Sequence, residues 1–101
     1  MSVVVVTKDN FDEIKNKTSV VMLDFYADWC GPCRMVGPIV HEIAEERNDI
    51  TVGKINVDND PDLAQKFGVM SIPTIVILKG TEEASRAVGV RTKQQLLDLL
   101  G

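Results

Sequence analysis

The chain has 101 residues, of which 11 are Lys or Arg and 15 are Asp or Glu, and its formal net charge is -4. This balance argues against a nucleic-acid partner, because binding to phosphate backbones needs a basic patch. With 45% hydrophobic residues the chain can bury one core, so residues 1–101 are expected to form a single domain. Its longest apolar run is far shorter than the roughly 20 residues of a membrane-spanning helix. The first residues lack the pattern of a secretory signal, which predicts a cytoplasmic protein.

The first half of the chain predicts two strands, each followed by a helix. A short valine-rich strand at residues 3–6 precedes a short helix that begins at Phe11, with Asn10 at its N-cap. Residues 20–26 (VVMLDFY) are a continuous run of β-forming residues, typical of a strand that is covered on both faces. Residues 35–47 then alternate apolar and charged positions with a helical period. We therefore expect a central strand followed directly by a long amphipathic helix.

The next segment predicts a third strand and a third helix. The strand is expected at residues 51–57, where apolar and β-branched residues dominate. Asp60 followed by Pro61 is typical of a helix cap, with proline at the first helical position, where it is tolerated. Gly68 is expected to end this helix.

The end of the chain predicts a hairpin and a last helix. The hairpin strands are expected at residues 74–78 and 84–88. Thr92, with Gln95 three residues later, forms the pattern of a capping box that opens a leucine-rich helix. The complete order βαβαβαββα predicts an α/β fold, in which a mixed five-stranded sheet carries helices on both faces.

Two cysteines, Cys30 and Cys33, stand between the central strand and the long helix. A disulfide across so short a loop removes little chain entropy, roughly 2 kcal/mol, so stapling the fold is a poor reason for this spacing. The helix N-terminus favours a thiolate at Cys30, whereas Cys33 lies one turn inside the helix and is expected to be more buried. The spacing therefore predicts a redox pair, with Cys30 as the nucleophile and Cys33 as the resolving thiol.

Metal sites compete for the same C-x-x-C motif. A zinc site would need two further Cys or His ligands, and His41 is the only candidate. An attached haem would need histidine at position 34, which is Arg34, and an iron–sulfur cluster would need more thiolates. We therefore expect no metal and no bound cofactor, while a static structural disulfide stays open as the alternative.

Asp24 interrupts the apolar strand six residues before Cys30. An unpaired charged carboxylate inside a sheet would cost several kcal/mol. A buried carboxyl has a raised pKa and can exchange a proton with a thiol near neutral pH, which predicts an acid-base role toward Cys33. The alternative is a solvated strand position. Lys54 on the adjacent strand either moderates this carboxyl or is simply exposed.

Three further residues are open on physical grounds alone. Pro73 opens a strand, and its preceding peptide bond is ordinarily trans. Trp29 belongs either to the core or to a docking surface beside the thiol. His41 is interpreted as an ordinary helix residue without a role.

Five stretches of the sequence together match one known pattern. They are residues 24–35 (DFYADWCGPCRM), Pro38, residues 54–58 (KINVD), Ile72-Pro73-Thr74 and Val88-Gly89. With them the chain resembles the thioredoxin family over essentially its whole length. It departs from the commonest family pattern at Tyr26, Gly37 and Gly80-Thr81. None of these departures changes a residue that takes part in the sulfur chemistry.

The resemblance implies a thioredoxin fold and a protein-disulfide reductase that works by dithiol–disulfide exchange. It implies that Cys30 is the nucleophile, Cys33 the resolving thiol, Asp24 the buried acid-base and Lys54 its neighbour. It also implies a cis peptide bond before Pro73, which would pack against the disulfide.

The resemblance further implies a substrate surface and partners. The surface residues would be Trp29, Gly31, Pro32, Ile72, Pro73 and Gly89. The partners would be disulfide-containing client proteins and a thioredoxin reductase, either an NADPH-dependent flavoprotein or a ferredoxin-linked enzyme, and the protein itself would be a monomer. An oxidase or isomerase domain is one alternative, although such domains usually carry His between the cysteines. A binding module that uses redox state as a switch is another.

Overall fold

The strand at the centre of the sheet is β2, as its continuous apolar sequence predicts. The computed structural model describes residues 3–101, so the first two residues of the predicted domain lie outside it. The five strands are β1 (Val4–Val5), β2 (Val20–Tyr26), β3 (Thr51–Asn56), β4 (Thr74–Lys79) and β5 (Glu82–Val88). They are ordered β1-β3-β2-β4-β5, and β2 pairs in parallel with β3 and antiparallel with β4. The predicted mixed sheet is confirmed.

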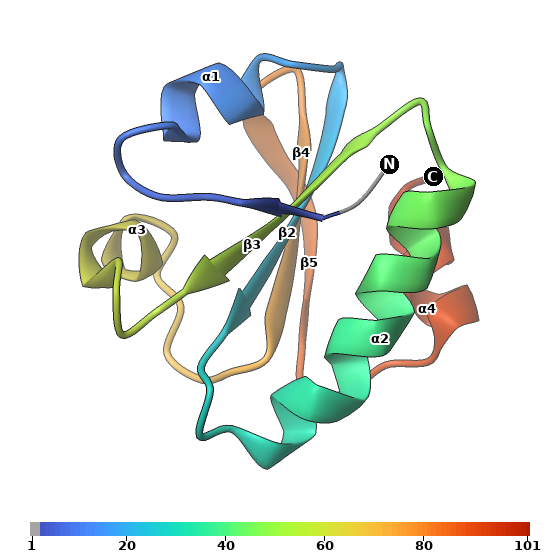
Figure 1. Cartoon of the computed structure of the whole chain (residues 1–101). Coiled ribbons are helices and arrows are strands. Elements are labelled where there is room, and N and C mark those ends of the chain that lie inside the picture. The colour runs from blue at the N-terminus through green and yellow to red at the C-terminus, as the bar shows by residue number, and fades with distance from the viewer. Residues whose placement is uncertain (1–2) are drawn as a thin grey trace.

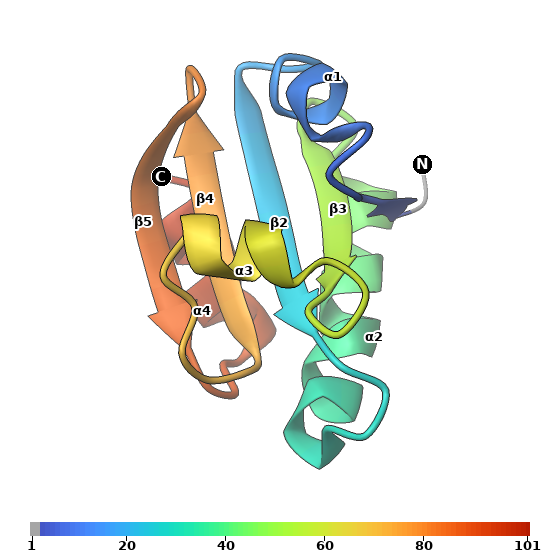
Figure 2. The same ribbon diagram turned by 90° about the vertical axis from the view of Figure 1, so that its left-hand side faces the viewer.

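Helices cover both faces of this sheet (Figures 1 and 2). The helices are α1 (Phe11–Lys15), α2 (Gly31–Glu46), α3 (Pro61–Lys66) and α4 (Lys93–Leu99). Buried residues of α2 and α4 share one core cluster with the sheet, and those of α1 and α3 share the other. The order of elements is therefore the predicted βαβαβαββα, with two helices on each face.

Alternation along β2 decides which face each of its side chains joins. Met22 packs in the cluster with α2 and α4, whereas Val21, Leu23 and Phe25 pack in the cluster with α1 and α3. Because side chains alternate with a period of two, Asp24 points to the same face as Met22. The one charged residue of this strand therefore faces α2, the helix that carries the cysteines.

Two predicted helix caps stand at the expected positions, but their side chains do not make the expected hydrogen bonds to the helices. Asn10 and Asp60 occupy the N-cap positions of α1 and α3, yet neither side chain bonds to its own helix. Instead, the side-chain Oδ1 of Asn10 accepts from the Thr7 amide at 2.8 Å, and its Nδ2 donates to the Val5 carbonyl at 2.9 Å. Asp60 accepts through Oδ1 from the Lys8 amide at 3.0 Å. These bonds hold the segment between β1 and α1 in place. The sequence around each cap residue does not indicate that its side chain binds this segment.

The C-terminal hairpin is longer than predicted. β4 continues to Lys79 and β5 begins at Glu82, two residues before its predicted start. Gly80 and Thr81 both adopt positive φ, at 62° and 75°, and so form a two-residue turn that keeps the strands paired to their ends. After β5, the capping box of Thr92 that opens α4 is confirmed.

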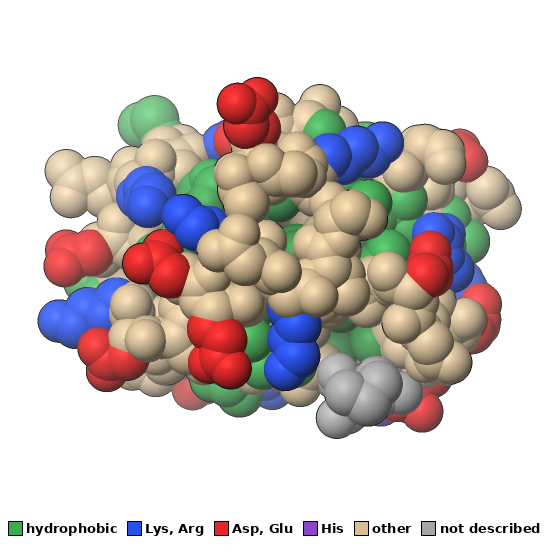
Figure 3. Space-filling model, turned by 90° about the horizontal axis from the view of Figure 1, so that it is seen from above, with side chains coloured by type: hydrophobic (Ala, Val, Ile, Leu, Met, Phe, Trp, Pro, Cys, Tyr) green, Lys and Arg blue, Asp and Glu red, His purple; other side chains and the backbone are tan. Residues whose placement is uncertain are grey.

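Charged side chains of both signs are scattered over the end of the molecule that lies away from the start of α2 (Figure 3). Within residues 3–101, no helix combines the length and the apolar character that crossing a membrane requires.

Candidate active site

The two cysteines lie where the chain passes from β2 into α2, and they form a disulfide. Cys30 is the N-cap residue of α2, and its Sγ accepts a hydrogen bond from the Cys33 amide at 3.2 Å. Their Cα atoms are 5.3 Å apart. In this oxidised form Cys30 is 4% exposed and Cys33 is 6% exposed, so the expectation that Cys33 is the more buried residue is wrong. The loop before α2 and the first helical turn enclose both residues to the same degree.

The segment before β4 lies against Cys30. The Cys30 Sγ is 3.9 Å from the carbonyl oxygen of Ile72, and the Ile72–Pro73 peptide bond is cis, as the family resemblance implies. The Gly89 amide donates to the Pro73 carbonyl at 2.8 Å, and Gly89 has φ 92°, a conformation that favours glycine. This bond joins the start of β4 to the end of β5 next to the segment that lies against Cys30.

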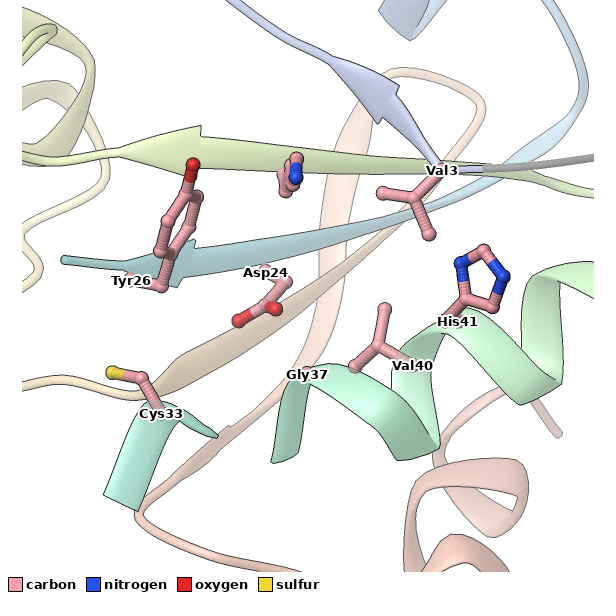
Figure 4. Close-up of a pocket in the computed structure, with 8 residues that line it drawn as sticks. Val3, Asp24, Tyr26, Cys33, Gly37, Val40 and His41 are labelled. Atoms are coloured by element: carbon pink, nitrogen blue, oxygen red, sulfur yellow. The ribbon is translucent and has the colours of Figure 1, made fainter. Parts of the chain in front are cut away.

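Asp24 lies behind Cys33, at the wall of a cavity of about 200 Å³ (Figure 4). Its side chain points from β2 toward α2 and is 5% exposed. The Oδ1 atom has no hydrogen-bond partner among residues 3–101. The cavity is lined by Val3, Asp24, Tyr26, Cys33, Gly37, Val40, His41 and Lys54. Asp24 and Cys33 therefore face the same cavity.

Burial dominates the electrostatics of this carboxyl. Desolvation raises the pKa of Asp24 from 3.8 to about 7, and the positive charge of Lys54 opposes that rise. Lys54 stands opposite Asp24 in the register of β3 and β2, and its Nζ lies 5.7 Å from the centre of the Tyr26 ring. Asp24 can therefore take up or release a proton near neutral pH.

An apolar groove adjoins Cys30 through Ile72, whose carbonyl oxygen lies 3.9 Å from the Cys30 Sγ and which lines the groove. It has a volume of about 360 Å³ and is lined by Trp29, Val57, Ala64, Val69, Met70, Ser71 and Ile72. Trp29 is 68% exposed, and its indole Nε1 donates to Asp58 at 2.8 Å, which holds the ring at the surface. Gly31 and Pro32 are exposed at the first turn of α2. Gly89 does not line this groove and reaches the site through its bond to Pro73.

Three residues of this region had no role among the expectations from the sequence. Met70 lines the groove, Asp58 binds the Trp29 indole and His41 lines the Asp24 cavity. Asp58 ends the KINVD stretch and His41 lies on α2 eight residues after Cys33, on the side of the helix that lines the cavity, whereas Met70 is brought to the groove by the loop before β4. At Met70 the available signal was a large apolar residue in a loop next to Ile72-Pro73.

A sequence profile described as thioredoxin matches residues 2–101. The chain belongs to the thioredoxin family. It is 46% identical to a thioredoxin of Pyropia yezoensis, over 99% of this chain and 95% of that protein. It is 43% identical to one of Alicyclobacillus acidocaldarius, over 89% and 87% of the two chains. Its structure resembles a mutant thioredoxin from Halobacterium salinarum with a TM-score of 0.93 at 38% identity, covering 98% of this chain and 88% of that one.

A further relative is a longer protein. The chain is 44% identical, over 86% of its length, to the bifunctional thioredoxin reductase/thioredoxin of Mycobacterium leprae, and this match spans 19% of that protein.

Membership of the family establishes the reaction class. The Cys30–Cys33 disulfide is the redox-active group, and the protein is a thiol–disulfide oxidoreductase that works by dithiol–disulfide exchange. Thioredoxins carry electrons on this pair and bind no cofactor for the reaction. A static structural disulfide is thereby set aside.

Proposed function

We propose that the protein reduces disulfides in client proteins, with Cys30 as the attacking thiol and Cys33 as the resolving thiol. The placement of the two residues supports this assignment. Cys30 is the N-cap of α2 beside an apolar groove, and the helix N-terminus favours a thiolate there. Cys33 lines the inner cavity together with Asp24, away from that groove.

The exchange proceeds in two displacements. The Cys30 thiolate attacks one sulfur of the client disulfide, so that a mixed disulfide forms and the other client sulfur leaves as a thiolate. Cys33 then loses its proton and attacks the Cys30 sulfur. The client is released with both thiols reduced, its two electrons having come from the Cys30–Cys33 pair.

Asp24 is the group that accepts the Cys33 proton in this proposal. It is buried, unpaired at Oδ1 and lines the same cavity as Cys33, and its pKa of about 7 suits proton exchange at neutral pH. Lys54 assists by favouring the ionised carboxylate. A proton accepted by Asp24 returns to solvent before the next cycle.

The apolar groove is the docking surface for the client segment that flanks the disulfide. It is exposed, apolar and next to the Cys30 sulfur, so a client chain laid along it brings its disulfide to that atom. Of the residues that the resemblance assigns to the substrate surface, Trp29 and Ile72 line this groove, while Gly31, Pro32, Pro73 and Gly89 lie outside its lining, near Cys30. Among them Trp29 and Ile72 supply apolar contact area.

Family membership implies a thioredoxin reductase and client proteins as the partners. The M. leprae relative, whose name joins a thioredoxin reductase and a thioredoxin in one protein, supports a thioredoxin reductase as the electron source. We propose further that the protein acts as a single-domain monomer in the cytoplasm, where thiols are kept reduced, and that it binds no nucleic acid.

Trapping of clients tests the two cysteine roles. A Cys33→Ser variant should accumulate mixed disulfides with a disulfide-linked test protein, because attack by Cys30 continues while resolution stops. A Cys30→Ser variant should accumulate none. The products are separated on non-reducing gels and located by mass spectrometry. Equal trapping by the two variants would exclude the assigned roles.

A further inference from the structure

Met70 is the most exposed large apolar side chain among residues 3–101, at 97%. It lies between α3 and β4, two residues before Ile72, whose carbonyl oxygen is next to the Cys30 Sγ. Its side chain lines the groove together with Trp29 and Ile72. A thioether is therefore held in full contact with solvent at the surface proposed to dock clients.

We propose that Met70 is a modification site, at which peroxide oxidation to the sulfoxide weakens docking of protein clients. The proposal rests on the groove function proposed above. The reagent class is hydroperoxides, with hydrogen peroxide as the simplest member.

The chemistry is complete without a further reactant. The thioether sulfur attacks the terminal oxygen of the peroxide, the O–O bond breaks and an S–O bond forms. Sulfur is oxidised by two electrons, and hydrogen peroxide is reduced to water.

The structure favours Met70 over the other described sulfur atoms. Cys30 and Cys33 are joined in the oxidised protein, so no thiolate competes for peroxide. Met22 is 0% exposed in the core. Met35 is 63% exposed on α2, but it does not line the groove. Oxidation of the disulfide form should therefore modify Met70 first and Met35 second, and only the first change alters the docking surface.

Oxidation changes the chemistry of the groove. Apart from Ser71, every side chain that lines it is largely apolar. A sulfoxide oxygen is a strong hydrogen-bond acceptor, and covering it with a client without a donor is unfavourable. We expect the KM for a protein disulfide to rise about three- to tenfold, the size expected when one polar group is covered imperfectly. Reduction of a small disulfide that leaves the groove open should not change.

The test treats the disulfide form with hydrogen peroxide and maps sulfoxides by peptide mass spectrometry. After reduction of the active disulfide, KM is measured with a folded disulfide protein and with a small aromatic disulfide. Wild type, Met70→Leu and Met35→Leu are each compared with their own untreated samples. The expected result is a rise in KM for the protein substrate in wild type and Met35→Leu, no rise in Met70→Leu, and reversal by methionine sulfoxide reductase.

Loss of docking in peroxide-treated Met70→Leu equal to that in wild type would overturn the proposal. So would a sulfoxide on Met70 with an unchanged KM. An untreated Met70→Gln variant with a wild-type KM would show that the groove does not dock clients, which also overturns the proposal. Failure of the exchange chemistry itself would be distinguished by loss of small-disulfide reduction in untreated wild type.

Discussion

Replacement of Asp24 by Asn should stabilise the folded protein, and by more at pH 9 than at pH 4. The reason is the buried carboxyl, whose Oδ1 has no hydrogen-bond partner among residues 3–101 and which has to ionise at high pH in surroundings that disfavour the charge. The same change removes the proposed proton acceptor and should slow disulfide exchange. Stability and activity are thus expected to move in opposite directions at one residue.

The magnitude follows from the pKa of the carboxyl. A rise from 3.8 to about 7 corresponds to about 4 kcal/mol, at about 1.4 kcal/mol for each pKa unit. Below pH 3.8 Asp24 is protonated in both the folded and the unfolded chain, so there is no cost. Between pH 3.8 and about 7 the unfolded chain has lost the proton and the folded chain keeps it, so stability falls as the pH rises. Above about pH 7 the cost is constant.

Urea unfolding of the disulfide form of wild type and Asp24→Asn at pH 4 and pH 9 measures this difference. Because a small domain has an m-value of about 1–3 kcal/mol per M in urea, the added stabilisation at pH 9 should move the midpoint by at least about 1 M. Asp9→Asn, at an exposed loop carboxyl, is the matched control and should follow wild type at both pH values. An equal stability difference between Asp24→Asn and wild type at pH 4 and pH 9 would refute the reasoning.

Three other outcomes are expected. The rate at which Cys33 resolves a mixed disulfide should rise with pH through about 7 in wild type, and this rise should be absent from Asp24→Asn in stopped-flow measurements. Gly53→Ala should destabilise the protein by about 1–3 kcal/mol in chemical denaturation, because an added Cβ would lie 2.5 Å from Cγ2 of the buried Val6; a neutral effect would mean that β1 moves aside. Thr92→Ala should lower stability by about 1 kcal/mol, and Thr92→Ser should restore most of it if the hydroxyl of the capping box is responsible.

The parts of the fold that could be predicted from the sequence are those whose cause is local. The run VVMLDFY is covered on both faces, so β2 has the predicted bounds. The side-chain bonds of Asn10 and Asp60 could not be predicted, because their partners belong to the β1–α1 segment rather than to the helices that they precede. The start of β5 depended on the positive φ of Thr81, which a threonine rarely adopts.

The candidate site divides in the same way. The cysteine pair was evident from spacing, and Asp24 was evident because a charge interrupts an apolar strand. The cis bond before Pro73 was accessible through the family resemblance alone, since most such bonds are trans. His41 was accessible from helical spacing, since it lies two turns after Cys33 on α2, whereas Met70 reaches the site through tertiary packing and no spacing rule connects it to Cys30.

Through the hydrogen bond from the Cys33 amide, the Cys30 sulfur, the proposed nucleophile, is also the N-cap acceptor of α2. In the reduced protein a thiolate accepts that N–H more strongly than a thiol does, so ionisation of Cys30 and closure of the first turn of α2 favour each other. By reciprocity, a substitution that frays this turn, even one far from any client, should weaken that hydrogen bond and with it the stabilisation of a thiolate at Cys30. The order of the first turn of α2 should therefore vary together with the reactivity of Cys30, and hydrogen exchange of the Cys33 amide should report on both.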